Sequence, residues 1–259
     1  MTMKLWEASK DQKNKSNLFR YENFLNQRYK IRFNKNYSKL HDWSIKNPEK
    51  FWSSIWDFSN VKGKKIEKFY KSKELFKNQF FLNSRLNFAE NLLSKNDNSK
   101  AITFVSENGY KEIRKWNELN INVGKISFYL KKINIKEKDR VAAYLPNLIE
   151  TVESFLATVS IGAIWSSCSP DFGVNGVIER FAQIKPKVLI LCDRYYYNGK
   201  EINVVDRLHL ILKKIKSIKN IIIINYPGKK NIKSKKNKNV NFEFWKNIKK
   251  LKPKKLEFK

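Results

Sequence analysis

Residues 160–173, with the sequence SIGAIWSSCSPDFG, hold the side chains best placed to contact a ligand. An apolar helical pattern ends at Gly162, and a short apolar run suited to a buried strand follows it. The small side chains, proline and aspartate that come next favour a tight turn with exposed backbone amides. Open α/β sheets usually bind ligands in loops at the carboxyl ends of their strands. The first candidate binding residues are therefore Ser169, Pro170, Asp171 and Phe172.

A second candidate segment, residues 193–200 (DRYYYNGK), follows an expected strand at residues 187–192 and should lie at the same edge of the sheet. Gly199 permits close approach of a ligand to the backbone, and Lys200 offers a cation. The three tyrosines could flank a planar or pantetheine-like group. Spacing alone, however, favours a surface turn with partly buried tyrosines.

Known catalytic motifs are absent from the sequence. It has neither a GxxxxGK[ST] run nor a GxGxxG after a strand, so these residues hold no phosphate cradle. His41 and His209 stand far apart without a cluster of cysteines or carboxylates, which argues against zinc. None of the serines lies in a GxSxG elbow. We therefore predict no catalytic residue and no metal site.

The elements that position these loops alternate between strand and helix. A hairpin is expected around Asn108-Gly109, because an Asn-Gly pair between apolar runs typically forms one. The later alternation has the spacing of βαβ units, which predicts an α/β fold with a mostly parallel sheet and helices on both faces. Strands are expected at 101–106, 110–113, 140–145, 163–165, 187–192 and 220–225, and helices at 116–133, 146–159, 174–184 and 204–218.

The chain divides into three regions by pattern. Residues 1–98 are expected to form a helical cap and a wrapping connection, with helices at 16–33 and 37–45 and a third that Asn47 caps and Pro48 begins. Residues 99–226 form a partial α/β domain. Residues 227–259 are expected to be a basic, mostly mobile tail with one short helix near Trp245 and no closing strand.

The net charge of +30, from 54 basic and 24 acidic residues, raises the possibility of a nucleic-acid partner. Lysine, asparagine, isoleucine, phenylalanine and tyrosine are enriched together, however, as A/T-rich codons dictate, and the lysines are spread along the chain. Cys168 and Cys192 fit no disulfide framework, and no apolar run approaches the length of a membrane span. We therefore expect a cytoplasmic protein without a membrane partner, for which nucleic acid is the less favoured alternative.

Several strings together resemble the acetoacetate:CoA ligase (acetoacetyl-CoA synthetase) family of the acyl-adenylate-forming superfamily. The resemblance covers about residues 5–226 and concerns only the amino-terminal part of the family. The string WSSCSPDFG is the most specific to the acetoacetate branch. The strings are WSIKNPEKFWSSIWDF (43–58), LNFAENLL (86–93), DRVAAYLPN (139–147), SIGAIWSSCSPDFG (160–173), RFAQIKPKVL (180–189) and YYNGK (196–200).

The resemblance implies an enzyme that joins acetoacetate to ATP as an acyl-adenylate, releases pyrophosphate and passes the acyl group to CoA, with Mg²⁺ offsetting phosphate charge. In the related acetyl-CoA synthetases, residues matching Ser169 to Phe172 lie along the CoA pantetheine. A Gly-Arg pair matching Gly199 and Lys200 meets the CoA phosphates, and lysine keeps that charge but loses bidentate hydrogen bonding. Arg180 matches a further arginine, for which we expect a structural role.

Family members are much longer than these 259 residues, and the phosphate loop and the carboxy-terminal lid with its adenylation lysine are missing here. We therefore expect an amino-terminal fragment of a ligase of acyl-CoA (ketone-body or fatty-acid) metabolism that is inactive alone. The alternatives are a CoA-binding module and a half-enzyme that acts with a second chain. ATP, Mg²⁺ and CoA are implied for the complete enzyme, whereas whether the gene is truncated or split, the acyl preference and the oligomeric state stay open.

Overall fold

The computed structural model describes residues 5–227, 239–252 and 254–259. Contacts divide the chain into two compact units, Met1–Leu86 and Asn87–Lys259. The finer division at residues 98 and 226 stays a prediction. No helix in the described ranges is long and apolar enough to span a bilayer.

The first unit is helical, as expected. Its core contains Tyr21, Leu25, Phe33 and Leu40, which come from two helices and the segment between them. Its elements are α1 (Lys10–Lys15), α2 (Asn17–Tyr29), α3 (Tyr37–Lys46), α4 (Pro48–Phe58) and the 3₁₀ helix η1 (Leu75–Lys77).

Two details of the first unit differ from expectation. The helix predicted at residues 16–33 ends at Tyr29, because Lys30 adopts a left-handed conformation with φ of 58°. Pro48 does begin α4, but the Asn47 side chain does not cap that helix. Its amide instead donates backward to the Trp43 carbonyl at 3.1 Å, which closes α3.

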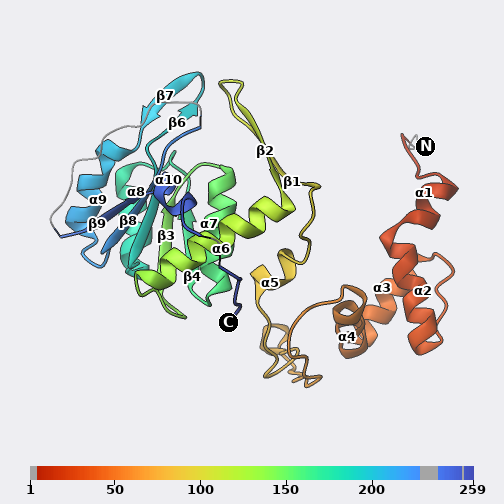
Figure 1. Cartoon of the computed structure of the whole chain (residues 1–259). Coiled ribbons are helices and arrows are strands. Elements are labelled where there is room, and N and C mark those ends of the chain that lie inside the picture. Colours follow the sequence, from red (N-terminus) through yellow and green to blue (C-terminus); the bar gives the residue numbers. More distant parts are fainter. Residues whose placement is uncertain (1–4, 228–238, 253) are drawn as a thin grey trace. The chain divides into compact units, whose positions relative to one another are not determined.

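The second unit carries the sheet and both candidate loops (Figure 1). Most strands and helices lie where the sequence predicted them. The elements are α5 (Phe88–Leu92), β1 (Lys100–Val105), β2 (Lys111–Lys115), α6 (Trp116–Lys132), β3 (Arg140–Tyr144), α7 (Ile149–Ser160), β4 (Ile164–Cys168), α8 (Val174–Ile184), β5 (Val188–Cys192), β6 (Arg194–Tyr197), β7 (Lys200–Asn203), η2 (Val205–Arg207), α9 (Leu208–Lys214), β8 (Asn220–Ile224), β9 (Asn241–Phe244) and α10 (Trp245–Lys249).

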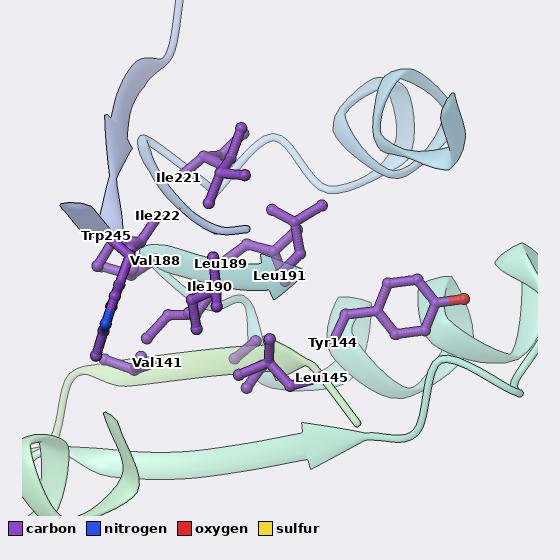
Figure 2. Packing of buried hydrophobic residues seen from close by; sticks show 14 of the residues in the cluster. Val141, Tyr144, Leu145, Val188, Leu189, Ile190, Leu191, Ile221, Ile222 and Trp245 are labelled. Atoms are coloured by element: carbon purple, nitrogen blue, oxygen red, sulfur yellow. The ribbon is translucent and has the colours of Figure 1, made fainter. Parts of the chain in front are cut away.

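Five parallel strands form the central sheet in the order β4-β3-β5-β8-β9. Strands β5 and β8 are buried along their whole length, as their uninterrupted apolar sequences require for strands covered on both faces. Figure 2 shows their aliphatic side chains packed with those of β3 and with Trp245. The predicted α/β fold class is confirmed.

Helices cover the two faces of this sheet. The chain moves from β3 to β4 in one direction and from β4 to β5 in the other, so right-handed crossovers place α7 and α8 on opposite faces. Helix α9 joins β5 to β8 in the same direction as α8 and contacts α8, whereas α6 contacts α7 and α10. The fold therefore places the carboxyl ends of β3, β4 and β5, with the loops that follow them, at one edge.

The end of the chain differs from the expected single helix. Residues 241–244 form strand β9, which pairs with β8 and closes that side of the described sheet. The prediction that no closing strand follows is wrong, because Phe242 and Phe244 alternate with Asn241 and Glu243 at the period of a strand. Helical spacing begins only at Trp245. Part of the predicted tail, residues 228–238 and 253, lies outside the described residues.

Asn87, the first residue of the second unit, joins segments that are distant in sequence. Its side-chain amide donates to the carbonyl oxygens of Val159 at 2.8 Å, Ser160 at 3.3 Å and Lys259 at 2.8 Å. The Lys259 amide in turn donates to the Ser160 carbonyl at 3.0 Å. One buried side chain thus links the beginning and the end of the unit to the end of α7.

Candidate functional site

The segment from Ser169 to Phe172 forms a β-turn immediately after β4. The Phe172 amide donates to the Ser169 carbonyl at 3.1 Å, and Pro170 occupies the second position, where its fixed φ suits the turn. The Ser169 hydroxyl donates to the Asp171 carboxylate at 2.7 Å, which tightens the turn from within. The sequence predicted this turn, and we call it the 169–172 turn.

A cavity of about 320 Å³ opens between the 169–172 turn and strand β6. The start of α7 completes its wall, so that residues following three different strands share one site. This confirms that the two candidate segments meet at one edge of the sheet. The lining residues are Leu145, Pro146, Asn147, Thr151, Ser167, Cys168, Ser169, Pro170, Asp171, Tyr195, Tyr196 and Tyr197.

The lining of the cavity suits an uncharged, polar group. Among the lining residues within the described chain, Asp171 is the one carboxylate and no lysine or arginine contributes. Three tyrosines offer flat apolar faces, while Asn147, Thr151 and Ser169 offer hydrogen-bonding groups. The donor set therefore fits the amides of a pantetheine chain and does not fit a phosphate.

The phenol of Tyr195 lies next to the turn. Burial raises the pKa of Tyr195, and a hydrogen bond with the Asp171 carboxylate raises it further. Burial also raises the pKa of the Cys168 thiol, against the opposing effect of Arg180. Both groups are neutral near pH 7, and a protonated thiol is a poor nucleophile, which agrees with a binding surface.

Gly199 and Lys200 lie in a hairpin outside the lining of this cavity. The sequence suggested a simple turn for residues 193–200, but β6 and β7 pair antiparallel, with positive φ at both Asn198 (49°) and Gly199 (71°). The Gly199 amide donates to Glu107 Oε2, in the β1–β2 turn, at 3.3 Å. The signal that was missed is the Asn-Gly pair, the same dipeptide that predicted the β1–β2 hairpin.

Phe172 and Arg180 contact each other at the end of the turn. The Arg180 guanidinium lies over the Phe172 ring, 4.5 Å from its centroid, while Phe172 is 41 % exposed. A cation–π contact of this kind holds the ring against α8. It agrees with the structural role expected for Arg180 and keeps Phe172 out of the cavity lining.

Sequence patterns did not single out Tyr144 and Arg207, although both contact the turn. Tyr144 ends β3 and its hydroxyl donates to the Phe172 carbonyl at 2.7 Å. Arg207, in η2, donates to the Pro170 carbonyl at 2.8 Å. The position of Tyr144 at the carboxyl end of a strand was an available signal. The position of Arg207 depends on how the β6–β7 hairpin returns the chain, which no local pattern encodes.

Asp193 stabilises the carboxyl edge of the sheet at which the cavity lies. Its side chain is fully buried after β5 and accepts hydrogen bonds from the Tyr226 amide at 2.8 Å and the Asn225 side chain at 3.1 Å. Arg194 Nη2 lies 3.5 Å from the same carboxylate. One buried side chain therefore joins the end of β5 to the end of β8.

Replacing Asp193 by alanine should destabilise the chain by about 2–3 kcal/mol, because it leaves buried donors without an acceptor. Urea unfolding at pH 7 measures this free energy. Asp193→Asn keeps one acceptor oxygen and should cost less, and Asp206→Ala, at an exposed position, serves as the matched control. A cost below about 0.5 kcal/mol for Asp193→Ala, the usual size of a surface substitution, would show that these bonds do not hold the edge.

Among the described residues, no three histidine, cysteine, aspartate or glutamate side chains come together as a metal site. Cys192 is fully buried, and burial raises the pKa of its thiol above the usual range. The candidate residues that the structure brings together are those that line the cavity at the carboxyl edge of the sheet.

Known proteins with sequences similar to this chain include acetoacetyl-CoA synthetases. Acetoacetyl-CoA synthetase of Xenopus tropicalis is 39% identical over 221 residues, which are 83% of this chain and 33% of that protein. Acetoacetyl-coenzyme A synthetase of Rhizobium meliloti (strain 1021) is 37% identical over 225 residues, which are 86% and 34%. The chain therefore spans about a third of the length of these relatives.

The fold agrees with a solved structure as well. Acetoacetyl-CoA synthetase from Streptomyces lividans superposes with a TM-score of 0.87 at 24% identity, over 99% of this chain and 39% of that one. The profile of the AMP-binding enzyme family matches residues 93–256, which include the whole central sheet and the candidate turn. The chain belongs to the AMP-binding enzyme family.

Proposed function

We propose that the chain is the amino-terminal region of an acetoacetate:CoA ligase and that it supplies one wall of the CoA site. The observation that carries the proposal is the cavity between the 169–172 turn and the β6 tyrosines, whose neutral polar lining suits pantetheine. The likeness to acetoacetyl-CoA synthetases over about a third of their length supports the reaction class. We place the protein in the cytoplasm and in acyl-CoA metabolism.

We propose two contact regions for CoA, namely the cavity and the β6–β7 hairpin turn. Ser169, Pro170 and Asp171, together with the tyrosines, would hold the pantetheine arm inside the cavity. Phe172, held by Arg180 outside the cavity lining, would contact the arm only where it leaves the cavity. Gly199 and Lys200, exposed in the hairpin turn, would meet the phosphates of the CoA nucleotide. When bound, CoA supplies the thiol that accepts the acyl group. ATP has no phosphate loop to hold it among these residues.

The chain by itself should not form acetoacetyl-CoA. Purified 259-residue protein is incubated with acetoacetate, ATP, Mg²⁺ and CoA, and both acetoacetyl-CoA and pyrophosphate are measured. We expect no product above the level without protein, because the sequence contains no phosphate-loop motif to position the triphosphate. A full-length acetoacetyl-CoA synthetase is the positive control. Product formation by this chain without a partner would overturn the proposed inactivity.

Binding tests the proposed site independently of turnover. Calorimetry with CoA and with pantetheine should show that Lys200→Ala weakens CoA binding by roughly tenfold, the value of one charge-assisted contact, and leaves pantetheine binding unchanged. Lys216→Ala, at an exposed lysine after α9, is the matched control. Equal losses for both ligands would contradict the assignment of Lys200 to the phosphates, and no binding of either ligand would contradict the site.

A further inference from the structure

Within the 169–172 turn, the peptide between Pro170 and Asp171 is held only weakly, by a long hydrogen bond of 3.4 Å from the Asp171 amide to the Ser169 hydroxyl oxygen. The one backbone hydrogen bond of the turn runs from Phe172 to Ser169 and leaves the Pro170 carbonyl without a partner inside the turn. Such a central peptide can rotate, because its two neighbouring dihedrals change together while the ends of the turn stay in place. The carbonyl end of this peptide must therefore be held by groups outside the turn.

Two side chains outside the turn supply that fixation. Arg207 Nη1 donates to the Pro170 carbonyl at 2.8 Å and to the Tyr144 hydroxyl at 2.5 Å. The Tyr144 hydroxyl donates to the Phe172 carbonyl at 2.7 Å and also lies 3.1 Å from the Pro170 carbonyl. The guanidinium and the phenol thus bind the carbonyls of Pro170 and Phe172, on either side of Asp171, and each other.

Both side chains have rigid supports. Tyr144 is fully buried at the end of β3, which lies between β4 and β5 in the sheet. Figure 2 shows its ring leaving the aliphatic core with the hydroxyl directed away from it. Burial raises the pKa of Tyr144, although Arg207 opposes this, so the phenol keeps the proton that it donates. Arg207 is the last residue of η2, and the next residue, Leu208, begins α9 and is buried in the core.

The consequence of this clamp is a fixed direction for the Asp171 amide. A trans peptide points its N–H opposite to its C=O, so holding the Pro170 carbonyl on Arg207 turns the Asp171 N–H to the opposite side of the turn. Rotation of this peptide would move Asp171 from its negative φ toward positive φ, which aspartate tolerates better than most residues. Without the clamp, only the 3.4 Å hydrogen bond from the Asp171 amide to Ser169 Oγ would oppose the rotated form.

We propose that Tyr144 and Arg207 are positioning residues that lock the Pro170–Asp171 peptide and so keep the 169–172 turn in the one conformation that lines the cavity. The ligand-binding consequence of this lock rests on the proposed function, since it concerns the pantetheine arm. The lock itself is a property of the chain alone and can be measured without any ligand.

The test compares amide hydrogen exchange of the whole chain in wild type, Tyr144→Phe and Arg207→Gln. Both variants should speed exchange at Asp171, Phe172 and Gly173 by roughly tenfold, the loss of about one net hydrogen bond. Arg207→Lys, which retains a donor, should recover part of the protection. Tyr129→Phe, which removes a hydroxyl from another buried tyrosine of the same unit, should leave the turn unchanged.

Exchange rates elsewhere in the unit and the Kd for pantetheine distinguish a local effect on the turn from destabilisation of the whole unit. Exchange in β3 and α9 should stay at the wild-type rate in Tyr144→Phe, while the Kd for pantetheine rises roughly tenfold. Unchanged exchange at the turn, or faster exchange spread over the whole unit, overturns the lock. Faster exchange with unchanged pantetheine affinity overturns its role in binding. If wild type binds no pantetheine, the proposed function fails, and the exchange rates alone decide the lock.

Discussion

Replacing Arg114 by methionine should destabilise the chain by about 3–5 kcal/mol at pH 8, because it strips the counter-charge from a buried carboxylate. Arg114 Nε lies 2.9 Å from Glu153, whose side chain is fully buried in α7. Arg114 Nη2 also lies 2.9 Å from Glu112. Methionine fills similar volume but cannot stabilise the charge of Glu153. Urea unfolding gives the free energy.

The double variant Arg114→Met/Glu153→Leu provides the control for this prediction. With both charges removed, the site becomes an apolar contact between β2 and α7, and most of the lost stability should return. The cost of Arg114→Met should also be smaller at pH 5, where Glu153 is protonated in the folded chain. A cost below about 1 kcal/mol at pH 8, as in an exposed ion pair, would contradict the role of Arg114.

Glu153 should also make stability fall as the pH rises from 4.5 to 8. Burial raises the pKa of Glu153 from 4.5 to about 7, against the opposing effects of Arg114 and Asn122. The folded chain therefore binds this proton more tightly than the unfolded chain does. The contribution is fully present below pH 4.5 and is lost as the pH rises through about 7. The total loss is about 3 kcal/mol.

Glu153→Gln isolates this contribution, since glutamine resembles the protonated carboxyl and does not titrate. Wild type and variant should unfold with similar free energies at pH 4.5 and differ by about 3 kcal/mol at pH 8, with the variant more stable. The pKa values of Asp57 and Asp139 are lowered in the fold, so these two groups make stability rise with pH. Because they contribute equally in both proteins, their effect cancels when the unfolding free energy of wild type is subtracted from that of the variant. Parallel pH profiles for the two proteins would rule out the shift. The charged and polar groups that face Glu153 are Arg114, Asn122, Glu150 and Lys249.

The elements that sequence predicted well are those whose pattern is local. Strand β8 is an unbroken isoleucine run, and such a run is buried wherever the sheet forms. Strand β9 was missed because its two phenylalanines run directly into the apolar residues of α10, so a period of two merged with a helical one. Where two short elements abut without a turn residue, only pairing with a neighbouring strand separates them.

In the candidate site, too, features encoded by local sequence could be predicted and features that depend on tertiary contacts could not. The turn at Pro170 could be predicted because proline and aspartate determine the backbone around them. Its partner Arg207 could not, since 37 residues separate the two and a hairpin must form before they meet. The cavity is likewise a product of three loops, each weak as a signal alone. The local sequence therefore predicted the position of the binding turn, whereas the residue that fixes the turn could be identified only from the tertiary structure.

The hydrogen bonds of Asn87 have a consequence for how the second unit folds during synthesis. The bond between Asn87 and Lys259 spans 172 residues, so it closes a very large loop. Until Lys259 has left the ribosome, the Asn87 amide lacks the Lys259 carbonyl and the Ser160 carbonyl at the end of α7 lacks the Lys259 amide. Contacts of such high sequence separation form slowly. The nascent chain therefore has a late, vulnerable interval in which chaperones would bind it.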